Sequence, residues 1–348
     1  MKKKLCVAIV TRKNDAFSLT RYRENIEKEL GNAGVSIRPF DEKGPIPEGC
    51  DLTWDPGIAG IRRIPEVLKY SRNPLILTVH GAAPFTLSQR ENSQSIHEAI
   101  RTLREKRNLI RDWSWMRKKV SAIIAVSEYG AREINRALAL PESIISSIHH
   151  GVDRETFFPS PREEEDEKSQ RFFFLHVSQY QPKKNLVRLL RAYEGLSGPE
   201  VPPLIIVSPG FPYDRHRSRI PEGVTVYSSG MSPEQLAELY RKAIAFVFPS
   251  LHETFGLPIL EAMSCGCPVI CSDRTACPEI VGDAGLLVDP RSVAQIRNAM
   301  QTIIEDVDLR GQLAERGLRR ANSFTWHESA RQHIDVFARF VHVGSTGL

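Results

Sequence analysis

The sequence predicts an α/β protein made of two doubly wound, Rossmann-like domains in tandem, and three observations support this fold class. The chain has 348 residues, about the length of two ordinary domains. Short apolar, β-branched runs alternate with amphipathic helical patterns along the whole chain, which is typical of βαβ units and a mostly parallel sheet. A proline-bounded acidic stretch separates the two halves. We therefore expect two sheets facing one another across a cleft, with ligands at the carboxyl ends of the strands.

Each half contains six expected strands. In the first half the helical segment YRENIEKELGNAG ends in the glycine expected after a helix. The first-half strands are LCVAIV, VSIRPF, DLTW, LILTVH, AIIAVS and SIISSIHH. The second-half strands are RFFFLHVS, PLIIVSP, VTVYSS, AFVFPS, PVICSD and AGLLVD.

Composition places the domain boundaries. The stretch FFPSPREEEDEKSQ is too acidic for a packed core, so residues 161–170 are expected to be an exposed linker. It separates an N-terminal domain, residues 1–160, from a C-terminal domain, residues 171–324. The pattern of residues 325–348 predicts a helix, and it leaves open whether this helix packs on its own domain or back on the first.

The composition is that of a globular protein without a membrane span. Hydrophobic residues make up 41% and the mean hydropathy is -0.28, and no run of eighteen apolar residues occurs. The first apolar run is too short for a signal peptide, so it is interpreted as a strand. Without such a signal, the six cysteines predict reduced thiols and a cytoplasmic location. Four of them form C-x-C-x3-C-x5-C, which is interpreted as buried thiols rather than a metal cluster.

One basic stretch stands out against a net charge of +5. Residues 101–119 hold eight Lys or Arg against two acids, with Trp113 and Trp115 among them. This pattern fits a solvated helix face with its tryptophans in the core. It also fits peripheral contact with an anionic membrane surface, and both interpretations stay open. No nucleic-acid partner is expected.

A phosphate site is predicted in PSLHETFGLPILEAMSCGCPV, residues 249–269. Here a buried strand leads into a helix with Pro258 in its first turn and Gly266 at its expected end. The turn between them offers backbone N–H groups and a partial positive charge. Glu261, one turn inside the helix, leans back toward this site, where a ribose diol suits a carboxylate. Glu253 would reach beyond the phosphates toward the group that they carry.

This block, followed by CPEIVGDAGLLVDP, closely resembles the donor site of the retaining glycosyltransferases of family 4, which have the GT-B fold. The hallmark of that family is two glutamates eight positions apart, as Glu253 and Glu261 are. HVSQYQPKKNLVRLLRAY resembles the family's glycine-and-lysine loop. LILTVHGAAPF, IIAVSEYGAREI and HHGVDRETFFP resemble its first-domain segments and occur in the expected order.

The resemblance implies roles for individual residues. Lys184 neutralises the donor diphosphate, Glu261 binds ribose, and Glu253 contacts the sugar and the charge developing at the anomeric carbon. His80 approaches the sugar from the first domain. Gln179 stands where the family often has an arginine, and Gly81 where an aspartate is common. The remaining implied donor contacts are the backbone of Thr254, Phe255, Gly256 and Leu257, and, beside the nucleobase, Gly210, Ser229, Gly230 and Met231.

The implied function is a metal-independent retaining hexosyltransferase that needs no cofactor. Its donor is expected to be GDP-mannose first and UDP-glucose second, and its acceptor a glycan, a lipid-linked sugar or a small molecule. A binding protein with decayed activity is one alternative. A nicotinamide-dependent dehydrogenase is another, although the first strand is not followed by G-x-G-x-x-G.

Two further patterns are interpreted as structural. His149 and His150 form a pair without a third metal ligand in view. Asp306-Val307-Asp308 resembles a metal-binding D-x-D, yet it lies in a helical segment far from any expected strand end.

Overall fold

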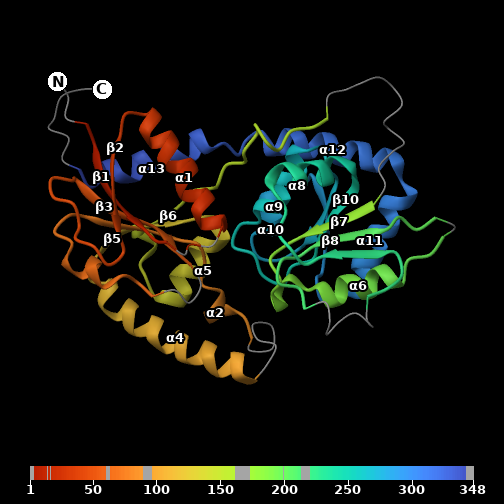
Figure 1. Ribbon diagram of the computed structural model, residues 1–348, viewed down its shortest axis with the longest axis horizontal. Coiled ribbons are helices and arrows are strands. Elements are labelled where there is room, and N and C mark those ends of the chain that lie inside the picture. Colours follow the sequence, from red (N-terminus) through yellow and green to blue (C-terminus); the bar gives the residue numbers. More distant parts are fainter. Residues whose placement is uncertain are drawn as a thin grey trace. The chain divides into compact units, whose positions relative to one another are not determined.

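The computed structural model describes residues 4–13, 15, 17–59, 63–88, 96–160, 173–198, 200–212 and 220–341. The chain divides into two compact units: Met1–Gly151 with Thr325–Leu348 is unit 1, and Val152–Phe324 is unit 2 (Figure 1). Each unit holds a six-stranded sheet whose strand pairs are all parallel. The predicted fold class, with two Rossmann-like domains, is confirmed, and so are the twelve expected strands.

Unit 1 has the strand order β2-β1-β3-β4-β5-β6. Its strands are β1 (Cys6–Thr11), β2 (Ser36–Asp41), β3 (Leu52–Ile58), β4 (Leu75–Val79), β5 (Val120–Ala125) and β6 (Ile145–Ser147). Its α-helices are α1 (Phe17–Asn32), α2 (Ala83–Thr86), α4 (Ile96–Met116), α5 (Glu128–Leu138) and α13 (Trp326–Ala338). Single 3-10 turns are η1 (Glu66–Tyr70) and η2 (Glu142–Ile144).

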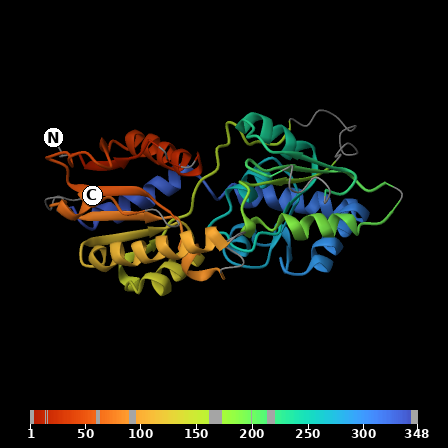
Figure 2. The same ribbon diagram turned by 60° about the horizontal axis from the view of Figure 1, so that its bottom comes forward.

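Alternating residues of the unit 1 strands build a core on each face of the sheet. Val7 and Ile9 of β1 pack with residues of α1 and α13, whereas Ala8 and Val10 pack with residues of α4 and α5. Figure 2 shows α4 and α5, in yellow and gold, along one side of this sheet and the red α1 along the other. Both faces are covered, which explains why the inner strands β1, β3 and β4 are almost continuously buried.

Unit 2 has the order β12-β11-β10-β7-β8-β9. Its strands are β7 (Phe173–Val177), β8 (Leu204–Val207), β9 (Val224–Tyr227), β10 (Ala243–Phe248), β11 (Val269–Ser272) and β12 (Gly285–Val288). Its helices are the 3-10 turn η4 (Pro182–Lys184), α6 (Leu186–Glu194), α8 (Pro233–Lys242), α9 (Leu257–Ser264), α10 (Cys277–Val281), α11 (Val293–Glu305) and α12 (Val307–Ala321).

Local sequence sets where several helices begin. Ser232 and Gln235 form a reciprocal capping box at α8, with Pro233 at its first position. Asp306 caps α12 by accepting the Leu309 N–H at 2.8 Å. The D-x-D at 306–308 therefore serves a helix start. All six cysteines are buried free thiols, and the described residues contain no group of three or more His, Cys, Asp or Glu placed to hold a metal ion.

The domain boundaries differ from those expected from composition. The units divide at residues 151 and 152 rather than at 160, and residues 152–160 belong to unit 2. The expected linker, 161–170, lies outside the described residues. The acidic run marked a stretch unsuited to a core, but membership of a unit follows from contacts such as the Val152 N–H to the Phe324 carbonyl at 3.2 Å.

The C-terminal helix α13 belongs to unit 1 and lies beside α1 (Figure 1). It begins at the cap Thr325 and buries Phe337 against Trp54 of β3, with ring centroids 5.6 Å apart. Its start passes very close to Gly151. A Cβ at that glycine would lie 2.2 Å from the Trp326 nitrogen, a backbone atom that cannot rotate away.

We expect Gly151→Ala to destabilise unit 1 by about 1–3 kcal/mol or more, because the added methyl group must push the start of α13 off the sheet. The check is thermal unfolding followed by circular dichroism. Gly31→Ala is the matched control, since that glycine lies in α1 with open space around its Cβ position. It should stabilise the same unit by roughly 0.5–1 kcal/mol. Equal melting of both variants would contradict the contact.

Candidate functional site

The strand order of unit 2 creates a switch point between β7 and β10. From β7 the chain moves outward to β8 and β9, and then returns to the other side of β7 with β10. The loops that follow β7 and β10 therefore diverge at neighbouring strands, which is where open α/β sheets bind ligands. Lys184 ends the 3-10 turn in the first loop, and Glu253 lies in the second.

Lys184 and Glu253 form a largely buried ion pair. The Lys184 Nζ lies 2.6 Å from Glu253 Oε1, and their side chains are 12% and 11% exposed. The Ser250 hydroxyl also donates to Oε1, at 2.6 Å. Within the described residues, both contacts of the carboxylate fall on Oε1, so Oε2 is the oxygen left to meet a ligand.

These contacts keep Glu253 ionised. Burial alone would raise the pKa of the Glu253 carboxyl, but the Lys184 ammonium, the Lys183 charge and the hydrogen bond from Ser250 outweigh burial, and the pKa lies below its ordinary value. At neutral pH the residue is a carboxylate and not a proton donor. Lys184 also lies over the Phe248 ring, 5.0 Å from its centroid, which holds the ammonium from a second side.

Asn185 joins the loops that carry this pair. Its backbone is left-handed, with φ of 65°, a conformation that asparagine tolerates better than most residues. Its amide nitrogen donates to the carbonyls of Pro249, at 2.8 Å, and Pro290, at 2.6 Å. The Leu251 N–H donates to the Lys183 carbonyl at 2.7 Å. The ends of β10 and β12 are thus tied to the lysine loop.

The loop after β11 holds the backbone of Glu253. The Glu253 N–H donates to Thr275 Oγ1 at 3.0 Å, and the Ala276 N–H donates to the Glu253 carbonyl at 3.3 Å. Both backbone groups of Glu253 therefore bind consecutive residues of one neighbouring loop.

Helix α9 starts at the glycine that the sequence places there. Gly256 is the N-cap with φ of 106°, and no side chain caps the helix. At the other end Gly266 is left-handed, and the Cys267 N–H returns to the Ala262 carbonyl at 2.9 Å. Thr254, Phe255 and Leu257 complete the turn into the helix. The predicted strand, turn and helix are confirmed.

Glu261 lies in the second turn of α9 and is half-buried. The Tyr240 hydroxyl of α8 donates to Glu261 Oε2 at 3.3 Å. Burial, and then the Glu261 charge, raise the pKa of Tyr240 well above its ordinary value, so the phenol stays a donor. Tyr240 thus orients the second glutamate of the predicted pair.

A neutral histidine lies beneath the site. His176 of β7 is fully buried and stacks on Phe248, with ring centroids 5.8 Å apart. Its Nδ1 donates to the Val247 carbonyl at 2.8 Å, which leaves Nε2 to accept from the Ser178 hydroxyl at 2.8 Å. Burial lowers the pKa of His176 to about 4, against the opposing Val247 bond. The imidazole therefore adds no charge beside Lys184 at neutral pH.

The residues predicted to border a nucleobase follow β8 and β9, and Gln179, which follows β7, lies beside them. Gly210 is left-handed, and its N–H donates to the Ser228 carbonyl at 3.1 Å. Gln179 donates through Nε2 to the Pro209 carbonyl at 3.0 Å, and this nitrogen would lie 3.4 Å from a Cβ at Gly210. The segment beside them contains Ser229 and Gly230, which are exposed, and Met231, which is half-buried. Gln179 thus hydrogen-bonds the loop after β8.

The structure places His80 in unit 1, directly after β4. Its Nε2 donates to the Pro56 carbonyl at 2.8 Å, which fixes the proton on that nitrogen because a carbonyl only accepts. The ring stacks on His150, with centroids 5.5 Å apart, and meets Tyr22 edge-on at 4.7 Å. Burial, and then the neighbouring histidines, lower the pKa of His150 well below its ordinary value.

Four contact residues of this site were not predicted: Ser250, Tyr240, Asn185 and Thr275. Ser250 and Asn185 stand within the quoted motifs PSLHE and PKKN, so their positions offered a signal. Tyr240 and Thr275 reach the site from other elements, and only the folded chain reveals them.

Comparisons with known proteins identify the family of the chain. The family described as "Glycosyl transferases group 1" matches residues 158–320, and "Glycosyltransferase Family 4" matches residues 53–156. The O-antigen chain mannosyltransferase B of Escherichia coli is 33% identical over 227 residues, which is 62% of this chain and 60% of that protein. The chain thus spans less than two thirds of that relative.

Two solved structures share the fold. Sucrose-phosphate synthase from Thermosynechococcus elongatus matches with a TM-score of 0.74 at 19% identity, covering 97% of this chain and 99% of that one. HepE of Anabaena, solved in complex with UDP and glucose, matches with a TM-score of 0.72 at 16% identity over 96% of this chain and all of that one. The two family matches adjoin, cover most of the sequence and carry the glutamate pair, and the chain belongs to the family 4, group 1 glycosyltransferases of the GT-B fold.

Proposed function

We propose that this protein is a metal-independent retaining glycosyltransferase that moves a hexose from a nucleotide-diphosphate sugar to an acceptor. The ion pair between Lys184 and Glu253 at the switch point carries the proposal. It sets a cation and an ionised carboxylate side by side at the edge where the sheet binds ligands. The names of relatives support it: the Escherichia coli protein is a mannosyltransferase, and HepE was solved with UDP and glucose.

The departing diphosphate requires positive charge. Lys184 has three N–H donors, and one of them is used by Glu253. We assign the others, with the backbone of residues 254–257 at the start of α9, to the phosphates. These protein groups would supply the charge that a divalent ion supplies elsewhere, which is the reason to propose metal independence.

Glu253 has a different chemical role from Lys184, because its carboxyl group is already ionised. A carboxylate cannot protonate the leaving phosphate, but it can stabilise a positive anomeric carbon and accept hydrogen bonds from sugar hydroxyls. Oε2 is the oxygen available for this. With the leaving phosphate helping to deprotonate the incoming hydroxyl, the acceptor attacks from the same side and the anomeric configuration is retained.

The remaining assignments follow the sequence prediction. Glu261 binds the ribose hydroxyls, and Gly210 with Ser229, Gly230 and Met231 borders the nucleobase. Gln179, an uncharged amide, stands where the family often has an arginine, and His80 keeps the role that the family resemblance implies for it.

GDP-mannose is the first proposed donor, with mannose as the transferred sugar, because the Escherichia coli relative described above is a mannosyltransferase. Glucose from UDP-glucose is the second. The acceptor class is a glycan, a lipid-linked sugar or a small molecule, as in polysaccharide biosynthesis. A binding protein that has lost activity is the alternative, and donor hydrolysis without acceptor distinguishes the two.

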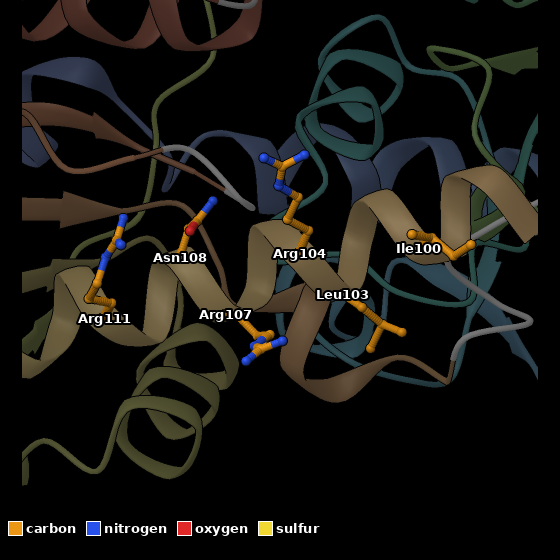
Figure 3. Close-up of a pocket in the computed structure, with 6 residues that line it drawn as sticks. All are labelled: Ile100, Leu103, Arg104, Arg107, Asn108 and Arg111. Carbon is orange, nitrogen blue, oxygen red and sulfur yellow. The ribbon is translucent and has the colours of Figure 1, made fainter.

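Helix α4 supports an additional membrane contact at the cytoplasmic side. Ile100, Leu103 and Ile110 are 60%, 52% and 51% exposed, and Arg104, Arg107 and Arg111 are exposed as well. Ile100, Leu103 and the three arginines line an open cavity of about 570 Å³ with Asn108. Figure 3 shows Arg104, Asn108 and Arg111 on one side of α4 and Leu103 and Arg107 on the other. Among the described residues no helix could cross a membrane.

Trp113 and Trp115 of α4 are not part of this exposed surface. Trp113 is buried in the unit 1 core, and Trp115 is half-buried under the Lys69 ammonium, 5.0 Å from its ring. The apolar part of the proposed membrane surface is therefore Ile100, Leu103 and Ile110. Arginines near an anionic surface each add about 1 kcal/mol of attraction.

For the catalytic proposal, we expect wild-type protein to melt at higher temperature with GDP or UDP and to hydrolyse the matching nucleotide sugar slowly without metal. Glu253→Gln should keep nucleotide binding and lower turnover by about a hundredfold or more, because the carboxylate acts on the transition state. Calorimetry and product release measure the two effects. Glu315→Gln, an exposed acid of α12, is the matched control.

The contribution of Lys184 has to be measured in a variant whose residue 253 carries no charge. Lys184→Ala alone leaves a buried carboxylate without its counter-charge, which destabilises the fold. The double variant Lys184→Ala/Glu253→Gln avoids this, and we expect it to bind nucleoside diphosphate about ten- to a hundredfold more weakly than Glu253→Gln. Equal affinities would remove Lys184 from the phosphate site.

For the membrane proposal, we expect wild-type protein to sediment with phosphatidylglycerol vesicles and not with phosphatidylcholine vesicles. Replacing Ile100, Leu103 and Ile110 by serine should abolish sedimentation, since the apolar contacts are lost. Val307→Ser removes an equally exposed apolar residue of α12 and should sediment as wild type does. Absence of any lipid preference in the wild type would contradict the proposal.

A further inference from the structure

We propose that Thr275 is a positioning residue for Glu253, and that its left-handed backbone directs the threonine hydroxyl toward the Glu253 N–H. The inference rests on the proposed function of Glu253. Thr275 lies in the loop between β11 and α10 and is not among the predicted site residues. Within the part of the chain that the structure describes, its contact with the site is the hydrogen bond with the Glu253 backbone.

The backbone of Thr275 is unfavourable for a threonine. Its φ is 61°, and among the described residues only Ala139 and Asn185 share a positive φ without being glycine. A branched Cβ crowds the backbone in this region, so threonine is a rarer occupant than either of those residues. Glycine or asparagine would fit the turn more easily. Strained backbone conformations cluster at functional sites, and we infer that the Thr275 side chain has a functional role.

The hydroxyl of Thr275 has a defined direction. Oγ1 donates its one proton to the Arg274 carbonyl at 2.7 Å, so its lone pairs must face the other partner. That partner is the Glu253 N–H, at 3.0 Å. Because the left-handed turn sets the direction of Oγ1, the strained backbone and the accepted hydrogen bond belong together.

Glu253 is consequently held at both ends. Thr275 and Ala276 bind its N–H and carbonyl, while Ser250 and Lys184 bind Oε1 of its carboxylate. Without the Thr275 bond the backbone end can shift while the carboxylate stays paired with Lys184, and Oε2 then moves away from the sugar. Nucleotide binding does not need this bond, whereas stabilisation of the transition state depends on the position of Oε2.

The test compares Thr275→Ser, which keeps the hydroxyl, with Thr275→Gly, which removes it and also relieves the backbone strain. Ala139→Gly is the control, since Ala139 is an exposed left-handed residue that ends α5 in unit 1. Four quantities are measured: melting temperature, affinity for GDP or UDP, turnover of the nucleotide sugar, and hydrogen exchange of the Glu253 amide.

We expect Thr275→Gly to lose about ten- to a hundredfold in turnover with unchanged nucleotide affinity. It should melt within about 3 °C of wild type, since strain relief opposes the lost hydrogen bond. Its Glu253 amide should exchange at least about tenfold faster. Thr275→Ser should keep the turnover of wild type and the slow exchange of the Glu253 amide. Ala139→Gly should leave both quantities unchanged.

Slow Glu253 exchange in Thr275→Gly would overturn the inference, and so would full turnover or a loss in Thr275→Ser as large as in Thr275→Gly. A parallel fall of melting temperature and nucleotide affinity would also overturn it by indicating a structural role. The exchange measurement does not need activity. If the wild type neither binds nucleotides nor turns over a nucleotide sugar, the proposed function fails, while fast exchange in Thr275→Gly still supports the backbone clamp.

Discussion

The buried ion pair of Lys184 and Glu253 is the interaction on which the arrangement of unit 2 depends. Two charges are costly to bury, and either one alone would be left without a partner in a low-dielectric surrounding. The loops after β7 and β10 must therefore stay together. Asn185 and the Leu251 N–H supply that connection through backbone carbonyls, so the pair and its scaffold stabilise one another.

The same pair sets the electrostatics of the site. The Lys184 ammonium and the Glu253 carboxylate offset one another, the nearby Lys183 adds positive charge, and the neutral His176 below adds none. In the proposed reaction, the donor diphosphate would bring negative charge beside Glu253, and Lys184 would interact with both. Under this proposal, the ammonium would stabilise the departing diphosphate and the carboxylate would stabilise the positive charge that develops on the sugar.

The sequence predicted the strands, the helix and the motif residues around this site, but not the contacts that join them. Strand and helix patterns located all twelve strands and the helix that starts at Leu257, because apolar periodicity reports burial directly. Glu253, Glu261 and Lys184 were predicted as site residues from local motifs. Thr275 and Tyr240 were not, because each meets its glutamate from another loop or helix, and such contacts leave no local pattern.

The boundary between the units shows the same limit. Acidic composition marked the expected linker, yet Val152 already pairs with Phe324 within unit 2, and α13 packs with α1 in unit 1. By itself the sequence determined the two parallel sheets, the turn at Gly256 and the glutamate pair, since periodicity, glycine conformation and residue spacing act over short distances. Only the tertiary structure decided that Glu253 pairs with Lys184, that Thr275 holds its backbone and that the last helix joins the first unit, because these contacts join segments far apart in the chain.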